Sequence, residues 1–168
     1  MKLRIILVFS SLTLLFACGQ TVNNKMANGT AWGSGSFDSN GKRIYFTSTS
    51  DRGTPITSTN GPSMGMMMMG GQLACVSCHG TNAKGGKHTM HLETMDAPDI
   101  RWSILSGDKN EKGTTVSKQN MDYGFEAFKN AVENGKNPDG EILKKDMPRW
   151  QMSDADLTDL MNYLKTQE

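Results

Sequence analysis

The motif Cys75-Val76-Ser77-Cys78-His79 constrains this chain more than any other stretch of its 168 residues. Two thiols three positions apart can reach the two vinyl groups on one edge of a porphyrin, and the adjacent imidazole can turn onto the central iron. Every part of the motif is then used. The motif therefore predicts one covalently attached haem c, with Cys75 and Cys78 as attachment points and His79 as an axial ligand.

Three other chemistries use a pair of cysteines at this spacing. A thioredoxin-like redox motif needs a βαβ context, which the surrounding sequence lacks. A structural zinc site needs further ligands, which His88 and His91 could supply together with Cys75 and Cys78. A plain disulfide between the two cysteines is the third alternative. We favour haem because it uses both cysteines and the adjoining histidine.

The first 17 residues have the pattern of a bacterial export signal. Lys2 and Arg4 precede an apolar run that is too short to span a bilayer comfortably. Residues 15–18, Leu-Phe-Ala-Cys, resemble the lipobox of bacterial lipoproteins, in which lipid is attached to the cysteine and cleavage occurs immediately before it. We therefore expect residues 1–17 to be a signal peptide, Cys18 to be lipidated, and the protein to lie at the periplasmic or outer face of a membrane. Ordinary cleavage that leaves a free thiol is the alternative.

The charge balance and the segment after Cys18 indicate how the chain is organised. The 18 basic and 17 acidic side chains give a formal net charge of +1, which lacks the basic footprint of a nucleic-acid-binding protein, so no such partner is expected. Residues 18–40 are rich in Asn, Gly, Ser and Thr and show no periodicity, which is typical of a flexible tether. We expect this tether to join the lipid anchor to a domain over residues 41–168.

Helical patterns dominate the predicted domain. A short apolar patch predicts a first helix over residues 41–46, and Asp99 is a plausible N-cap for a helix over residues 100–105. Helical spacing predicts a third helix that ends at Gly135, and a fourth that begins at Ser153. The apolar positions are Tyr123, Phe125, Phe128, Ala131 and Val132 in the third helix, and Leu157, Leu160, Met161 and Leu164 in the fourth. No alternating strand pattern is present, so the predicted fold class is all-α with much loop.

The cysteine motif, the pair Met147-Pro148 and the final amphipathic helix together resemble a class I c-type cytochrome domain. The resemblance covers about residues 41–166. It implies a cytochrome c-like fold, in which about three to five helices are wrapped around one haem. In that family the first and last helices cross at close range. The resemblance therefore implies that Gly41 allows this approach and that Tyr163 packs at the crossing.

The same resemblance implies roles for two further residues. Met147 matches the family's distal methionine, so His79 and Met147 would be the two axial ligands of the haem iron. Pro98 matches a proline whose carbonyl accepts a hydrogen bond from the proximal imidazole and so fixes its orientation. If Met147 instead belongs to the core, the alternative distal ligands are Met152, Met121, His88 and His91.

Residues 47–74 depart from compact members of this family, which place the cysteine motif soon after the first helix. The insertion is rich in glycine and methionine. Flexible thioethers can pack against an exposed haem edge or a docking surface, and they can also bind soft Cu(I). We favour packing or docking, because consecutive methionines would point in different directions. The candidate copper ligands are Met64, Met66, Met67, Met68 and Met69.

These observations favour electron transfer over enzyme catalysis, because two strong axial ligands leave the iron no open site. The expected partners are redox proteins, with a quinol-oxidising complex or a dehydrogenase as electron donor and a terminal oxidase or reductase as acceptor. One alternative is a haem-based ligand-binding or sensing protein, or a weak peroxidase, with a labile sixth ligand. The other is a methionine-rich copper-handling module with an accessory haem.

Overall fold

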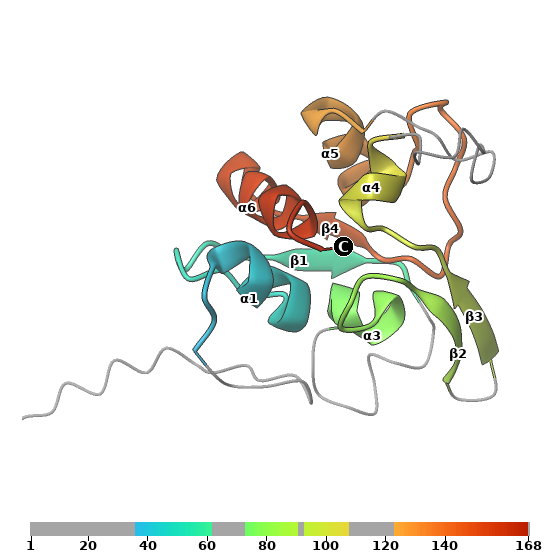
Figure 1. Cartoon of the computed structure of the whole chain (residues 1–168), viewed down its shortest axis with the longest axis horizontal. Coiled ribbons are helices and arrows are strands. Elements are labelled where there is room, and N and C mark those ends of the chain that lie inside the picture. Colours follow the sequence, from blue (N-terminus) through green and yellow to red (C-terminus); the bar gives the residue numbers. More distant parts are fainter. Residues whose placement is uncertain (1–35, 62–72, 91–92, 108–122, 168) are drawn as a thin grey trace, which may run out of the picture.

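The computed structural model describes residues 36–61, 73–90, 93–107 and 123–167. Figure 1 shows α1 and α6 side by side, with α3 and the β2/β3 hairpin to their lower right and α4 and α5 to their upper right. The elements are α1 (Asn40–Thr47), β1 (Thr57–Thr59), α3 (Cys75–His79), β2 (Gly86–Met90), β3 (Glu93–Ala97), α4 (Trp102–Leu105), α5 (Phe125–Asn134), β4 (Arg149–Gln151) and α6 (Asp154–Leu164).

Two short antiparallel sheets show that the expectation of a strand-free fold is wrong. β1 pairs with β4, with Ser58 opposite Trp150, and β2 pairs with β3, with Thr89 opposite Thr94. The first pair has only three residues in each strand, which is too short for an alternating pattern to be recognised. The second pair has mostly polar residues, and Met95 is its only buried side chain among those described, so the apolar signal is too weak to predict a strand.

The first helix is confirmed and crosses the last one as predicted. Ser39 caps α1 by accepting a hydrogen bond from the Lys42 amide at 3.2 Å. A Cβ atom on Gly41 would overlap the carbonyl oxygen of Asp159 and lie 2.8 Å from the Cβ atom of Tyr163. The backbones of α1 and α6 therefore approach so closely that only glycine fits at this point.

The ends of α5 and α6 also agree with the sequence. Gly135 ends α5 in the left-handed conformation, with a φ of 65°, and Ser153 caps α6 by accepting from the Asp156 amide at 3.2 Å. By contrast, α4 begins two residues later than predicted. Asp99 does not cap it, because its carboxylate accepts from the Arg101 amide at 3.0 Å and pairs with the Arg101 guanidinium at 2.6 Å.

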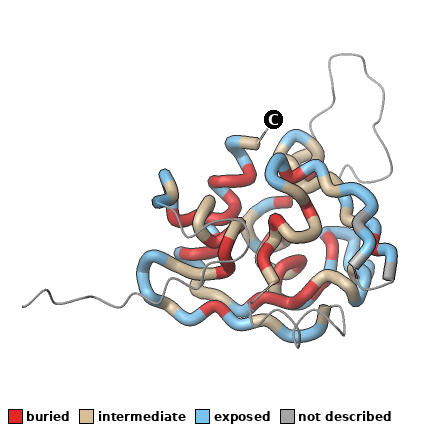
Figure 2. The backbone as a smooth tube through the Cα atoms, turned by 90° about the horizontal axis from the view of Figure 1, so that it is seen from below, coloured by how far each residue is buried: buried red, intermediate tan, exposed pale blue. Residues whose placement is uncertain are grey.

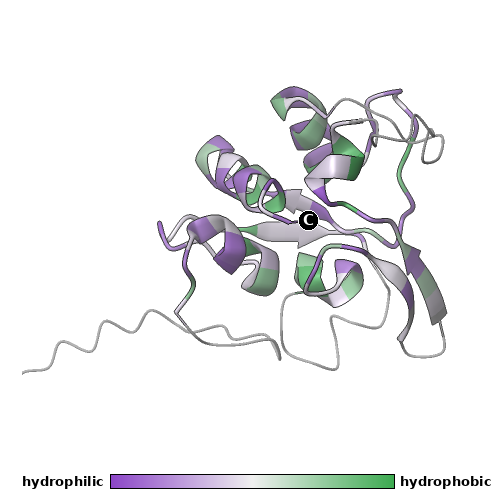
Figure 3. Cartoon of the chain, viewed as in Figure 1, coloured by the Kyte–Doolittle hydropathy of each residue, from purple (hydrophilic) through white to green (hydrophobic). Residues whose placement is uncertain are grey.

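The core lies between α1, α3, α5 and α6, where buried positions gather on the inner sides of the chain (Figure 2). Each of the longer helices carries both hydrophobic and hydrophilic residues (Figure 3), as expected for helices with one face on a core. The largest fully buried side chains are Tyr45, Ile44, Leu157, Val76 and Asp156. Four of these five are the apolar or aromatic side chains that a core requires, and the fifth is a carboxylate.

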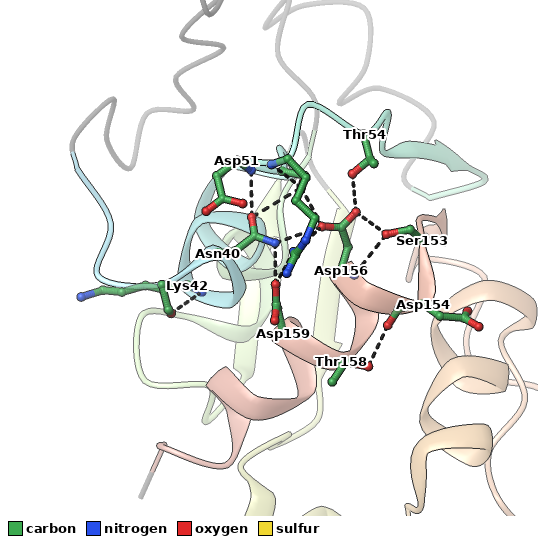
Figure 4. A network of polar contacts seen from close by, with 12 residues as sticks. Asn40, Lys42, Asp51, Thr54, Ser153, Asp154, Asp156, Thr158 and Asp159 are labelled. Atoms are coloured by element: carbon green, nitrogen blue, oxygen red, sulfur yellow. Dashed lines mark hydrogen bonds and ion pairs between the residues drawn. The ribbon is translucent and has the colours of Figure 1, made fainter.

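That carboxylate, Asp156, is fully buried in the first turn of α6 and is the centre of a polar network (Figure 4). It accepts hydrogen bonds at 3.0, 2.6 and 2.7 Å from Asn40, Ser50 and Ser153, and further ones from Thr54 and Arg52. Asn40 and Arg52 also bind Asp159. This Asp156 network ties the segment after α1 to the start of α6.

Several predicted segments lie outside the described residues. They are the signal peptide over residues 1–17, the lipidation site Cys18, most of the tether, and the candidate copper ligands Met64 and Met66 to Met69. Within the part of the chain that is described, no helix has the length and apolar character needed to cross a membrane.

Candidate haem-binding site

The cysteine motif forms the whole of α3. One helical turn separates Cys75 from His79, so these two side chains share a face of the helix. Gly80 ends α3 with a φ of 73°, and its carbonyl accepts a hydrogen bond from the buried Tyr45 hydroxyl at 2.6 Å. This contact fixes the end of α3 against α1.

Cys75, Cys78 and His79 line one cavity of about 440 Å³. This volume lies within the range of roughly 300–1,000 Å³ that is typical of cofactor pockets. Most of the lining is apolar, and representative side chains are Leu105, Phe128, Val132, Leu143, Leu160 and Leu164. Met147 lines the same cavity from the segment that precedes β4. The residues present therefore fit a large apolar prosthetic group that is bound through sulfur and nitrogen atoms.

The His79 imidazole is buried and oriented by one backbone group. Its Nδ1 atom lies 3.0 Å from the carbonyl oxygen of Pro98. Because a carbonyl oxygen only accepts hydrogen bonds, Nδ1 carries the proton, and the lone pair of the neutral ring is then at Nε2. This is the arrangement that a histidine ligand of iron requires, and the resemblance implied it for Pro98.

The backbone of Gly85 packs closely against the Pro98 carbonyl. Its amide donates to the carbonyl oxygen of His79 at 2.9 Å, and its φ is 66°. A Cβ atom at this position would overlap the carbonyl oxygens of both Ala97 and Pro98. The segment that follows α3 therefore packs against Ala97 and Pro98 so closely that no side chain fits at Gly85.

Replacing Gly85 with alanine is expected to lower the free energy of unfolding by roughly 3 kcal/mol, because strain at positive φ adds to the overlap with two carbonyls. Gly140→Ala is the matched control, since Gly140 has a φ of 83° but open space around it. We expect that control to cost only about 1 kcal/mol. Denaturant unfolding of the holo-proteins compares the two, and equal losses would show that the contact with Pro98 contributes nothing.

The two thiols lie in surroundings that favour their neutral form. Burial raises the pKa of Cys75 to about 12. Burial also raises the pKa of Cys78, with a further contribution from the negative charge of Asp146. Among the described residues, no group of three or more His, Cys, Asp or Glu side chains could hold a metal ion.

None of the alternative distal ligands is among the described residues that line the cavity. Met152 is partly buried against the core and is not among the described residues that line the cavity. Met121 and His91 lie outside the described residues, as does the side chain of His88. The cavity has a second thioether that the sequence analysis did not consider as an iron ligand, that of the buried Met95 on β3.

Met95 comes from the strand that packs beside the cysteine helix. β3 contacts α3 and leads directly to Pro98, whose carbonyl faces His79. Met147, by contrast, comes from a segment remote from His79 in sequence. Axial ligands must approach iron from two opposite faces of the porphyrin. The strand that carries Met95 is thus in contact with the helix that carries His79, whereas Met147 enters the cavity from a separate segment.

An apolar cavity with two cysteines and an oriented histidine on one short helix defines a haem protein of the c type. The family model for cytochrome c matches residues 39–168. The chain belongs to the cytochrome c family, which confirms the resemblance, and it therefore has the cytochrome c fold. Members of this family bind covalently attached haem c, and Cys75, Cys78 and His79 fit that attachment. No curated protein and no solved structure gives a significant match.

Proposed function

We propose that this protein carries single electrons on one haem c. In this proposal Cys75 and Cys78 form thioether bonds to the haem, and His79 and Met147 are the axial ligands of its iron. The observation that supports the proposal is that all four side chains line the same cavity. His/Met ligation raises the reduction potential of a haem and suits reversible electron transfer.

The described residues support a carrier more than an enzyme. The Pro98 carbonyl orients the proximal imidazole, and the mostly apolar walls of the cavity would limit the contact of a bound haem with water. When bound, the haem supplies a one-electron couple, and no substrate bond has to be made or broken. With His79 and Met147 both bound, no coordination position remains for oxygen or peroxide.

The proposal extends to location and partners. The export signal and the lipobox-like residues 15–18 support a lipoprotein anchored at the periplasmic or outer face of a membrane. A tether over residues 18–40 would keep the haem domain close to membrane complexes and raise their effective concentration. We propose a quinol-oxidising complex or a dehydrogenase as the electron donor, and a terminal oxidase or reductase as the acceptor.

Optical spectra of the holo-protein test the ligand assignment. The oxidised parent should show a low-spin spectrum with a methionine-to-iron charge-transfer band, and Met147→Ala should lose that band. Carbon monoxide should bind the reduced variant at least about tenfold more tightly than the parent, because no thioether has to be displaced first.

Met95→Ala is the matched control, since it removes the same kind of side chain from the lining of the same cavity. It should keep the charge-transfer band and the weak carbon monoxide binding of the parent. Loss of the band in Met95→Ala, but not in Met147→Ala, would transfer the distal role to Met95. A parent that is high-spin, or that binds carbon monoxide readily, would favour the ligand-binding alternative.

A further inference from the structure

Arg149 places a buried positive charge beside the segment that carries Met147. This arginine is the first residue of β4, and only 8% of it is exposed. Its Nη1 atom donates to the carbonyl oxygen of Met147 at 2.6 Å. Its Nη2 atom donates to the carbonyl oxygens of Leu143 at 2.9 Å and Lys144 at 3.3 Å. One side chain thus binds three backbone groups of residues 143–148, which we call the distal segment.

Among the described residues, no carboxylate forms an ion pair with the Arg149 guanidinium. The ion pairs found there involve Lys42, Arg52, Arg101 and Lys129, but not Arg149. A buried guanidinium is costly unless its donors are well satisfied. Here three backbone carbonyl groups accept hydrogen bonds from the guanidinium. Their arrangement matches the planar set of donors that arginine presents.

Neighbouring groups constrain both the side chain and the backbone of Arg149. A Cβ atom on Gly135 would overlap the guanidinium group, so this side chain occupies the space that the glycine leaves. The backbone of Arg149 pairs with Thr59 in the β1/β4 sheet. Next to it, Pro148 lies against Gly61, where an added Cβ would be 3.0 Å from the proline ring. The inserted residues 57–61 therefore fix the strand from which the side chain starts.

We infer that Arg149 is a positioning residue for Met147. By binding the carbonyl groups on the Met147 side of the cavity, it holds the thioether in reach of the haem iron. Its charge also favours the reduced state, because the oxidised site carries one more positive charge than the reduced one. The inference rests on the proposed ligation by Met147 and adds the group that maintains it.

The test compares holo-proteins with Arg149→Met, Arg149→Lys and Arg43→Met. Arg149→Met removes both the charge and the hydrogen-bonding fork, whereas Arg149→Lys keeps the charge and loses the fork. Arg43→Met is the control for the loss of one positive charge elsewhere in the molecule. Arg43 lies on α1, and its guanidinium carbon is 5.3 Å from the centroid of the Phe37 ring. The measurements are the charge-transfer band, carbon monoxide affinity, reduction potential, and hydrogen exchange of the backbone amides of residues 143–147.

In Arg149→Met we expect a weaker charge-transfer band, a lower potential, and at least about tenfold increases in carbon monoxide affinity and in amide exchange of the distal segment. Arg149→Lys should show the same increase in exchange and carbon monoxide binding, but a potential closer to that of the parent. Arg43→Met should match the parent in all four measurements.

The outcomes separate this inference from the function on which it rests. A parent without the charge-transfer band would overturn the ligation by Met147, and this inference with it. A parent with the band, together with Arg149 variants whose band, carbon monoxide affinity and exchange equal those of the parent, would overturn the positioning role alone. If Arg149→Met does not fold, Arg149→Lys decides by the same criteria.

Discussion

Gly41→Ala should lower the free energy of unfolding by roughly 3–5 kcal/mol. In an open helix the same substitution stabilises, by about 1 kcal/mol, because alanine has the higher helix propensity. Here the added Cβ would overlap the Asp159 carbonyl oxygen, and backbone on the facing helix cannot move aside as a side chain can. The clash therefore reverses the sign that propensity alone predicts.

Circular dichroism during denaturant unfolding of the holo-protein measures this effect. Gly124→Ala is the control, because a Cβ at Gly124 meets nothing within 4 Å. That control should cost less than about 1 kcal/mol. A Gly41→Ala protein as stable as the parent would show that α1 and α6 separate at little cost.

The damage from Gly41→Ala should reach the haem site through an aromatic contact. The rings of Tyr45 and Tyr163 lie 5.2 Å apart across the helix crossing. The Tyr45 hydroxyl also donates to the carbonyl of Gly80, directly after His79. Separation of α1 from α6 would pull on this hydrogen bond. Changes in the haem spectrum are therefore expected together with the loss of stability.

Asp156→Asn should cost about 3–5 kcal/mol at neutral pH, because it replaces an anion that several buried donors face. Asp154→Asn is the matched control in the same first turn of α6. The Asp154 carboxylate is exposed and binds Lys129 at the surface, so its loss should change stability far less. Equal effects of the two substitutions would show that the Asp156 network adds nothing to the fold.

The effect of Asp156→Asn should depend on pH. Burial alone would raise the pKa of Asp156, but hydrogen bonds from Ser50, Thr54, Ser153 and Asn40 outweigh burial and hold the pKa below its ordinary value. The stability that this carboxylate contributes is then fully present above the unfolded-state pKa of about 3.9 and is lost as the pH falls toward the folded-state value. The difference in stability between parent and variant should shrink as the pH falls below about 4.

Local signals predicted the parts of the fold that depend on local chemistry. Ser153 and Gly135 mark helix ends because capping and left-handed geometry are properties of single positions. The β1/β4 pair was missed because each strand has three residues and its partner is remote in sequence. The start of α4 was misplaced because the Asp99 carboxylate binds Arg101 instead of capping the helix.

For the haem site too, local motifs were predictable from the sequence and long-range contacts were not. The cysteine motif predicted the attachment chemistry, and the structure brings Pro98 and Met147 to the cavity with it. The sequence could not reveal Arg149, because an arginine after a proline reads as an ordinary surface residue until its burial is known. The signal peptide, lipidation at Cys18 and copper binding remain predictions.

The pairing of β1 with β4 also bears on the order in which the molecule assembles. It joins residues that lie on either side of the cysteine motif and far apart along the chain. Closing such a long loop carries a larger entropic cost than forming a helix or a local hairpin, so long-range pairings form late. We therefore expect the cysteine helix to stay open to the haem-attachment machinery early in folding, and the distal side to close over the haem only afterwards.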